Sequence, residues 1–364
     1  MPFCVVGEYQ QGVGGERMIS DDGIRIFYHL YGRGRTKVLF ISGLASTHEC
    51  WSPQLRGLLG TDKPNDDDGS GCIDERDEEE DGIQVCAFDN RGVGQSSIPM
   101  KKSDYTTTIM AQDALALMDH LGWSKAHVVG HSMGAMISCK LAAMVPKRVS
   151  SLALLNATGG GYECFPKIDK LMISILFRFI RAKTPEQRAA VDLDTHYSKE
   201  YLDEYVGSDT RRKILYQEYV KAISSSGMQS NYGFDGQMSA CWNHSMSSKE
   251  LEAIRSAGFP VSVIHGRYDI IARLCHAQKL AEKLKPAARM VELHGAHLVS
   301  HERFEEVNQA LLDLIQASET KMSLQVWSNS YGDQVDWQAA GLSVSLKRRI
   351  LRHFKPVRVG SAES

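Results

Sequence analysis

The chain has 364 residues, of which 43% are hydrophobic and 24% are charged, and its formal net charge is −2. This length allows one large α/β domain with an insertion. The near-neutral charge and the lack of a recognition module argue against nucleic-acid binding. The start of the chain lacks a charged segment followed by a long apolar run, so we expect neither a secretory signal nor a membrane span.

Strand and helix patterns alternate along the first 158 residues. We expect a hairpin over 18–31 with its turn at 21–23, strands over 37–42, 83–88, 126–129 and 149–155, and helices over 51–60, 106–121 and 135–144. This alternation predicts a mostly parallel sheet with helices on both faces.

The motif Gly130-His131-Ser132-Met133-Gly134 fits G-x-S-x-G. It lies between a predicted strand and a predicted helix, where such a serine occupies a strained turn with its hydroxyl exposed. The two glycines suit this turn because a Cβ at either position would crowd it. We interpret Ser132 as a nucleophile; the alternative is an ordinary packing turn of small residues.

A serine hydroxyl needs a base and an orienting carboxylate, which follow this motif in the order serine, acid, histidine. Asp269 follows a predicted strand over 260–264, and His297 follows another over 290–293. Open α/β sheets place their sites at such strand ends. His294 and His301 compete with His297, but His294 lies too close to the strand and His301 at the entry of the next helix.

From 159 to about 247 helical patterns dominate, which indicates an inserted segment. Its most apolar run, 171–181, is far shorter than the about 20 residues of a membrane span. One interpretation is a helix packed on the core, and the other is an apolar roof that accepts acyl chains, with Phe177 as a substrate contact.

Two segments are expected to stand outside the fold. Residues 62–82 hold eleven Asp or Glu against Lys63 and Arg76, which predicts a flexible acidic loop. Residues 318–364 form a tail whose basic stretch, 347–355, could touch an anionic membrane. The eight scattered cysteines lack a C-x-x-C pair and suit a reducing compartment.

Four segments in order resemble the α/β-hydrolase superfamily, in its capped serine esterase or lipase-like branch. They are 40–44, 88–96, the Ser132 motif, and the paired motifs 266–269 and 295–297. The resemblance covers about 18–317. It implies an α/β-hydrolase fold with an N-terminal segment 1–17, a core of 18–158 and 248–317, and a helical cap over 159–247.

The resemblance also implies roles for the loops around Ser132. The backbone N–H groups of Leu44 and Met133 would form the oxyanion hole, and Gly43 and His131 would contact the substrate. Ser42 stands where many relatives carry histidine. Arg91 is expected to hold its loop in place. The strand before the cap is followed by Asn156-Ala157-Thr158 with no carboxylate, which favours Asp269 as the acid.

We therefore expect a serine hydrolase that cleaves a lipophilic carboxylic ester through Ser132, His297 and Asp269, without metal or organic cofactor. The alternatives are a non-hydrolytic or C–C bond-cleaving enzyme of the same fold, and a ligand receptor with vestigial activity. Cytosol is the expected location, with nucleus or membrane surface as alternatives. The sequence leaves the oligomeric state open.

Overall fold

The computed structural model describes residues 2–6, 23–65, 82–226 and 229–330. Most of the acidic loop and the basic stretch 347–355 lie outside these residues. Among the described residues, no helix combines the length and the apolar character needed to cross a bilayer. All seven cysteines of this part of the chain are unpaired.

The core is an eight-stranded sheet in the order β1-β2-β4-β3-β5-β6-β9-β10. Its strands are β1 (Phe3–Val6), β2 (Ile24–Tyr31), β3 (Thr36–Ile41), β4 (Ile83–Phe88), β5 (Ala126–His131), β6 (Val149–Leu155), β9 (Val261–Gly266) and β10 (Ala288–Leu293). β2 pairs antiparallel with β1 and β4, and every other pairing in the sheet is parallel. The central strands β5 and β9 are buried along their whole length, which explains their mostly apolar sequences.

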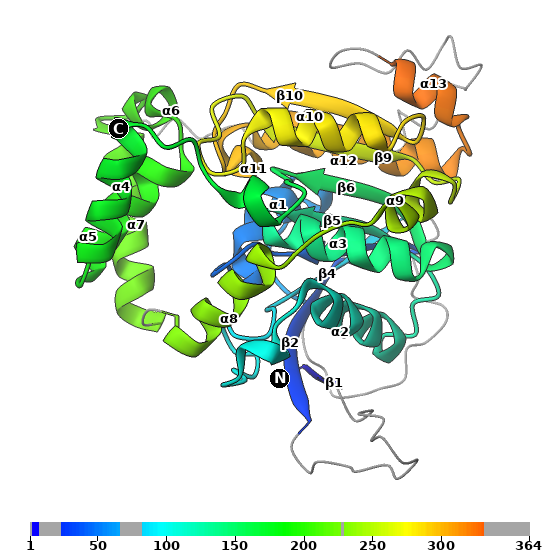
Figure 1. Ribbon diagram of the computed structural model, residues 1–364, viewed down its shortest axis with the longest axis horizontal. Coiled ribbons are helices and arrows are strands. Elements are labelled where there is room, and N and C mark those ends of the chain that lie inside the picture. The colour runs from blue at the N-terminus through cyan, green and yellow to red at the C-terminus, as the bar shows by residue number, and fades with distance from the viewer. Residues whose placement is uncertain (1, 7–22, 66–81, 227–228, 331–364) are drawn as a thin grey trace, which may run out of the picture.

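Helices cover both faces of this sheet (Figure 1). One face packs against α2 (Thr107–His120), α3 (Met133–Met144), α9 (Ser248–Arg255) and α10 (Leu274–Lys283). The other packs against α1 (Ser52–Leu59), α12 (Phe304–Glu319) and α13 (Leu324–Asn329). The predicted α/β-hydrolase fold, a mostly parallel sheet between helical layers, is confirmed.

Between β6 and β9 the chain leaves the sheet and forms a separate group of helices, at the left of Figure 1. These are α4 (Lys170–Arg181), α5 (Pro185–His196), α6 (Lys199–Asp203), α7 (Arg211–Ser226) and α8 (Asn231–Trp242). A two-stranded ribbon, β7 (Tyr205–Val206) with β8 (Asp209–Thr210), joins α6 to α7. Two-residue strands are too short to show alternation, so the sequence pattern did not predict them.

β2 pairs with a strand that the sequence analysis did not predict. In the described residues its partner is β1, with Phe3 opposite Phe27. Residues 18–22 lie outside the described part of the chain. The predicted N-terminal segment 1–17 thus contributes a strand to the core sheet, and this four-residue strand is too short to carry a clear pattern.

The predicted tail also begins too early. α12 extends to Glu319, and α13 places Trp327 in the core, where its ring is 0% exposed. The Trp327 indole N–H donates to the Val261 carbonyl at 2.8 Å, and the Arg289 guanidinium lies 4.1 Å from the indole ring centre. Residues 318–330 therefore belong to the folded core; a six-residue helix anchored by one aromatic side chain has no detectable period.

Candidate active site

Ser132 occupies a sharp turn between β5 and α3. Its φ of 54° and ψ of −117° lie in a region that L-residues rarely adopt. The turn requires glycine on both sides. A Cβ on Gly134 would lie 2.0 Å from the Ile41 carbonyl oxygen, and one on Gly130 would lie 2.3 Å from the Gly134 oxygen. The strained turn expected from the motif is present.

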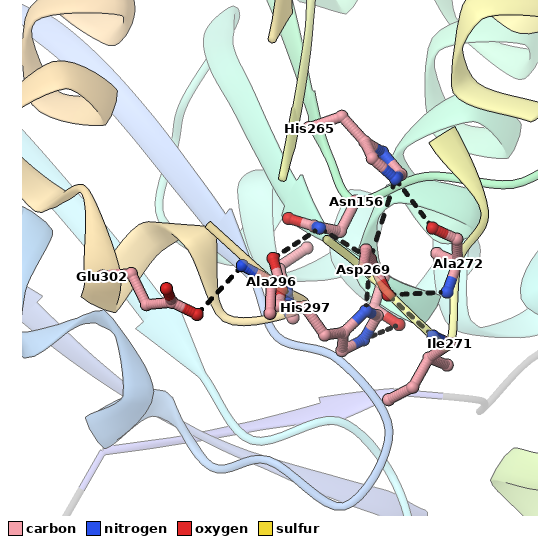
Figure 2. Close-up of polar contacts among 10 residues, drawn as sticks. Asn156, His265, Asp269, Ile271, Ala272, Ala296, His297 and Glu302 are labelled. Carbon is pink, nitrogen blue, oxygen red and sulfur yellow. Dashed lines mark hydrogen bonds and ion pairs between the residues drawn. The ribbon is translucent and has the colours of Figure 1, made fainter. Parts of the chain in front are cut away.

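The structure brings the three predicted polar side chains together from three strand ends. Ser132 Oγ lies 3.1 Å from His297 Nε2. His297 Nδ1 lies 2.8 Å from Asp269 Oδ2, as the close-up in Figure 2 shows. This order allows the imidazole to take a proton from the hydroxyl while the carboxylate holds the ring in one tautomer.

The Asp269 carboxylate is held on both oxygens. Oδ1 accepts from the backbone N–H groups of Ile271 and Ala272, each at 2.8 Å, and Oδ2 accepts from Asn156 Nδ2 at 2.7 Å (Figure 2). Burial alone would raise the Asp269 pKa. The electrostatic interaction and hydrogen bond with His297, together with His265 and Asn156, outweigh burial, so the pKa of Asp269 lies below its usual value.

Asn156 is a site residue that the sequence analysis treated only as the absence of a carboxylate. It is buried at the end of β6 with a positive φ of 49°. Besides Asp269, its Nδ2 also contacts the Ala296 carbonyl at 3.2 Å. The signal was available, because an amide directly after a buried strand lies at the same sheet edge as Ser132.

Two further histidines flank His297. The His131 ring centre lies 5.0 Å from that of His297, and the His196 ring centre lies 5.9 Å away. Burial lowers the pKa of both His131 and His196 to about 3, so both rings are neutral at neutral pH. His196 ends α5, and no motif in the sequence singled it out.

His131 holds the loop that carries His297 in place. Its side chain is buried, and its Nε2 donates to the His297 carbonyl at 2.8 Å. This hydrogen bond holds the ring against the backbone of the loop. The substrate contact predicted for His131 would therefore require the bond to break.

The competing histidines have other partners. The partly buried His301 lies between the Cys50 carbonyl, 2.8 Å from Nε2, and the Tyr197 hydroxyl, 3.0 Å from Nδ1. The half-exposed His294 pairs with the Tyr268 hydroxyl at 2.7 Å. Of the three, His297 is the one whose ring nitrogen meets Ser132 Oγ.

The predicted oxyanion donors lie on either side of Ser132. Met133 is the first residue of α3, and first-turn N–H groups have no acceptor within their own helix. Leu44 follows Gly43, which packs against the nucleophile turn: a Cβ on Gly43 would lie 3.4 Å from the Ser132 Cβ. The backbone at Gly43 and at Met133 therefore lies next to Ser132.

Arg91 holds its loop, as expected. Its guanidinium makes two bonds of 2.6 Å to the Asp113 carboxylate and one of 2.7 Å to the Asp104 carbonyl. Both charged side chains are buried. These contacts fix the segment that follows β4.

A cavity of about 240 Å³ lies between the loop after β9 and the start of α4. Its lining residues are Lys167, Asp169, Leu171, Met172, Asp269, Ile270, Arg273 and Cys275. Phe177 lies one to two turns further along α4, 55% exposed, with the Arg181 guanidinium 4.0 Å from its ring centre. Leu171 and Met172 are thus the α4 side chains beside Asp269.

The inserted helices are tied to the His297 loop. The Leu298 N–H donates to the His196 carbonyl at 2.9 Å. The buried Glu302 carboxylate accepts from the Ala296 N–H at 2.9 Å, as Figure 2 shows, and from the Ser198 N–H at 2.8 Å. α5 and α6 therefore contact the loop on both sides of His297.

The chain is similar in sequence to known proteins, over different lengths. Over 134 residues the chain is 34% identical to the putative carbamate hydrolase RutD of Caulobacter segnis, covering 36% of this chain and 42% of that protein. It is 28% identical over 291 residues to the putative non-heme bromoperoxidase BpoC of Mycobacterium tuberculosis, covering 79% of this chain and 97% of the relative. The chain thus spans about two fifths of the first relative's length.

Solved structures share the architecture. The crystal structure of the enol-lactonase from Burkholderia xenovorans superposes with a TM-score of 0.61 at 21% sequence identity, covering 80% of this chain and 97% of that one. The family described as alpha/beta hydrolase fold matches residues 36–304. This match includes the strand ends that carry Ser132, Asp269 and His297. The chain therefore belongs to the α/β-hydrolase superfamily.

Proposed function

We propose that this protein is a serine hydrolase that cleaves carboxylic esters through a Ser132-His297-Asp269 triad. The observation that carries the proposal is the continuous line of contacts from Ser132 Oγ through the His297 ring to Asp269, at 3.1 and 2.8 Å. The strained backbone at Ser132 supports it, because such strain persists where the surrounding structure maintains it and clusters at functional sites.

The reaction follows from this geometry. His297 Nε2 accepts the Ser132 proton as Oγ attacks the ester carbonyl, and the Leu44 and Met133 N–H groups stabilise the oxyanion. The imidazolium then gives its proton to the leaving alcohol, which departs as the acyl-enzyme forms. Water, deprotonated by His297, attacks the acyl carbonyl; the proton returns to Ser132 as the acid leaves.

The two neutral histidines favour the charged intermediate. A cationic neighbour would oppose the imidazolium that His297 becomes, but burial keeps the rings of His131 and His196 uncharged. The Asp269 carboxylate, whose pKa is lowered, stays ionised and stabilises the imidazolium. The charge pattern thus suits general-base catalysis at neutral pH.

The proposed substrate is a small lipophilic ester, and the proposed cap is the segment 159–247. Leu171 and Met172 provide apolar surface beside Asp269, while Lys167 and Arg273 add polar groups at the rim. RutD is named as a putative carbamate hydrolase, and a carbamate presents the same kind of acyl carbonyl to a nucleophile.

Hydrolysis of p-nitrophenyl esters of increasing chain length tests the proposal. We expect turnover that rises beyond acetate, is lost in Ser132→Ala, and is blocked when a fluorophosphonate labels Ser132. A maximum at acetate contradicts the lipophilic substrate. Full activity in Ser132→Ala, or labelling of another residue, contradicts the proposed triad.

A further inference from the structure

A buried glutamine of the inserted segment touches two loops of the core. Gln237 lies on α8 and is 0% exposed. Its Oε1 accepts from the Ala45 N–H at 2.9 Å, and its Nε2 donates to the Arg91 carbonyl at 2.9 Å. One side-chain amide therefore joins α8 to the loop after β3 and to the loop after β4.

The first of these loops contains the proposed oxyanion donor. Ala45 follows Leu44 directly and has a φ of 61°, a left-handed conformation that L-residues rarely adopt. The peptide between Leu44 and Ala45 carries the N–H that Gln237 holds. On the N-terminal side of Leu44, Asn90 Nδ2 donates to the Ser42 carbonyl at 2.9 Å. Two amide side chains thus fix the loop around Leu44.

The orientation of the Gln237 amide is determined by its neighbours. Gln229 Nε2 donates to Gln237 Oε1 at 3.1 Å and to the Gly92 carbonyl at 2.8 Å. Since Ala45 N–H and Gln229 Nε2 are donors and the Arg91 carbonyl is an acceptor, only one flip of the Gln237 amide satisfies all three.

The position of α8 leaves Gln237 little freedom. A Cβ on Gly233 would lie 1.9 Å from the Gly92 carbonyl oxygen, and one on Gly236 would lie 2.3 Å from the Tyr105 ring. These two glycines let the helix backbone rest directly on the core. The reach of the Gln237 side chain to Ala45 is therefore set by a tight helix contact.

We propose that Gln237 is a positioning residue for catalysis, holding the Leu44 N–H toward the oxyanion through its bond to Ala45. This inference rests on the proposed function. It makes α8 of the inserted segment part of the catalytic apparatus, because the core loop alone would have to maintain its left-handed turn without the Gln237 acceptor.

The test compares an ester substrate with its thiono analogue, in which sulfur replaces the carbonyl oxygen. Sulfur accepts weak hydrogen bonds, so a well-placed oxyanion donor favours the oxygen ester. In Gln237→Leu we expect kcat for the ester to fall about 10- to 100-fold, because small misplacements have effects of this order. KM should change less than about twofold, and the preference for oxygen over sulfur should fall with kcat.

Asn243→Leu is the matched control, since this amide lies at the end of the same helix and bonds only to Ser239 among the described residues. It should leave kcat and the oxygen preference at wild-type values. If Gln237→Leu does not fold, Gln237→Glu serves instead. It keeps an acceptor for Ala45 but lacks the donor to Arg91, so any loss of kcat should be accompanied by a matching loss of the oxygen preference.

An unchanged kcat in Gln237→Leu overturns the inference, as does an equal loss for both substrates. If only Gln237→Glu folds, a loss of kcat without a matching loss of the oxygen preference overturns it. Wild-type protein without Ser132-dependent cleavage overturns the proposed function and this inference together. Active wild-type protein with an unaffected Gln237→Leu overturns this inference alone.

Discussion

Asn156 donates its side-chain amide to Asp269 at 2.7 Å, so the residue after β6 supports the acid that follows β9. In this chain the residues at the two strand ends have complementary roles. Asp269 accepts from the imidazole, and Asn156 satisfies the same carboxylate oxygen from the other side. The first prediction tests this arrangement.

Replacing Asn156 by Asp should move the acid limb of the pH–rate profile to higher pH. A second carboxylate beside Asp269 adds negative charge near His297 and favours its protonated form, by roughly one pH unit. The profile of kcat/KM against pH measures this shift. Asn156→Ala should lower kcat without the shift, so an Asp variant with a wild-type profile would contradict the electrostatic account.

Replacing Ser132 by Gly should separate stability from activity. Glycine adopts the positive φ of this turn without strain, and the relief is worth about 1 kcal/mol. Urea unfolding should therefore show a more stable protein whose esterase activity has fallen by about 10⁴-fold or more. Ser132→Ala, which keeps the Cβ, provides the control and should lack the gain in stability.

Stability should fall as the pH drops below 6.5, because His131 and His196 are held neutral in the fold. Their folded pKa of about 3 lies below the ordinary value of 6.5, so the unfolded chain binds more protons between these values. For each of these histidines, the free energy of unfolding should be about 1.4 kcal/mol lower at pH 5.5 than at neutral pH. Unfolding free energies measured from pH 7.5 to 4.5 give the slope.

His131→Gln provides the comparison for this pH dependence. Glutamine keeps an N–H donor for the His297 carbonyl but does not titrate, so the slope between pH 6.5 and 4.5 should become shallower. A variant with the wild-type slope would show that His131 is not held neutral.

Trp327 should be essential for stability although it lies beyond the predicted end of the core. Removing a fully buried indole costs about 3–5 kcal/mol, so Trp327→Ala should lower the free energy of unfolding by that amount. A chain ending at residue 317 should melt several degrees below one ending at residue 330. Equal melting temperatures for both truncations would refute the assignment.

The parallel strands and the three polar residues at their ends were predictable for a common reason. Ser132, Asp269 and His297 each follow an apolar run long enough to identify a buried strand, and parallel strands bring such ends to one edge. Glycine spacing then marked the nucleophile turn. The order of these residues along the chain was sufficient to predict their proximity, because a parallel sheet places the carboxyl ends of its strands at one edge.

The supporting residues were not predictable in this way. Gln237 and His196 lie on helices whose relation to the core depends on packing, and neither belongs to a spacing motif. β1 and α13 were missed because four to six residues do not display a period. What escaped prediction is therefore what depends on contacts between distant, short or non-periodic elements.

The bonds from His196 and Ser198 to the loop around His297 have a mechanical consequence. If α5 and α6 moved away as a rigid unit, their hydrogen bonds to Leu298 and Glu302 would have to break, or the loop that carries His297 would have to move with them. The position of these two helices and the position of His297 are thus coupled through those hydrogen bonds. A widely open state should be chemically silent until those bonds re-form.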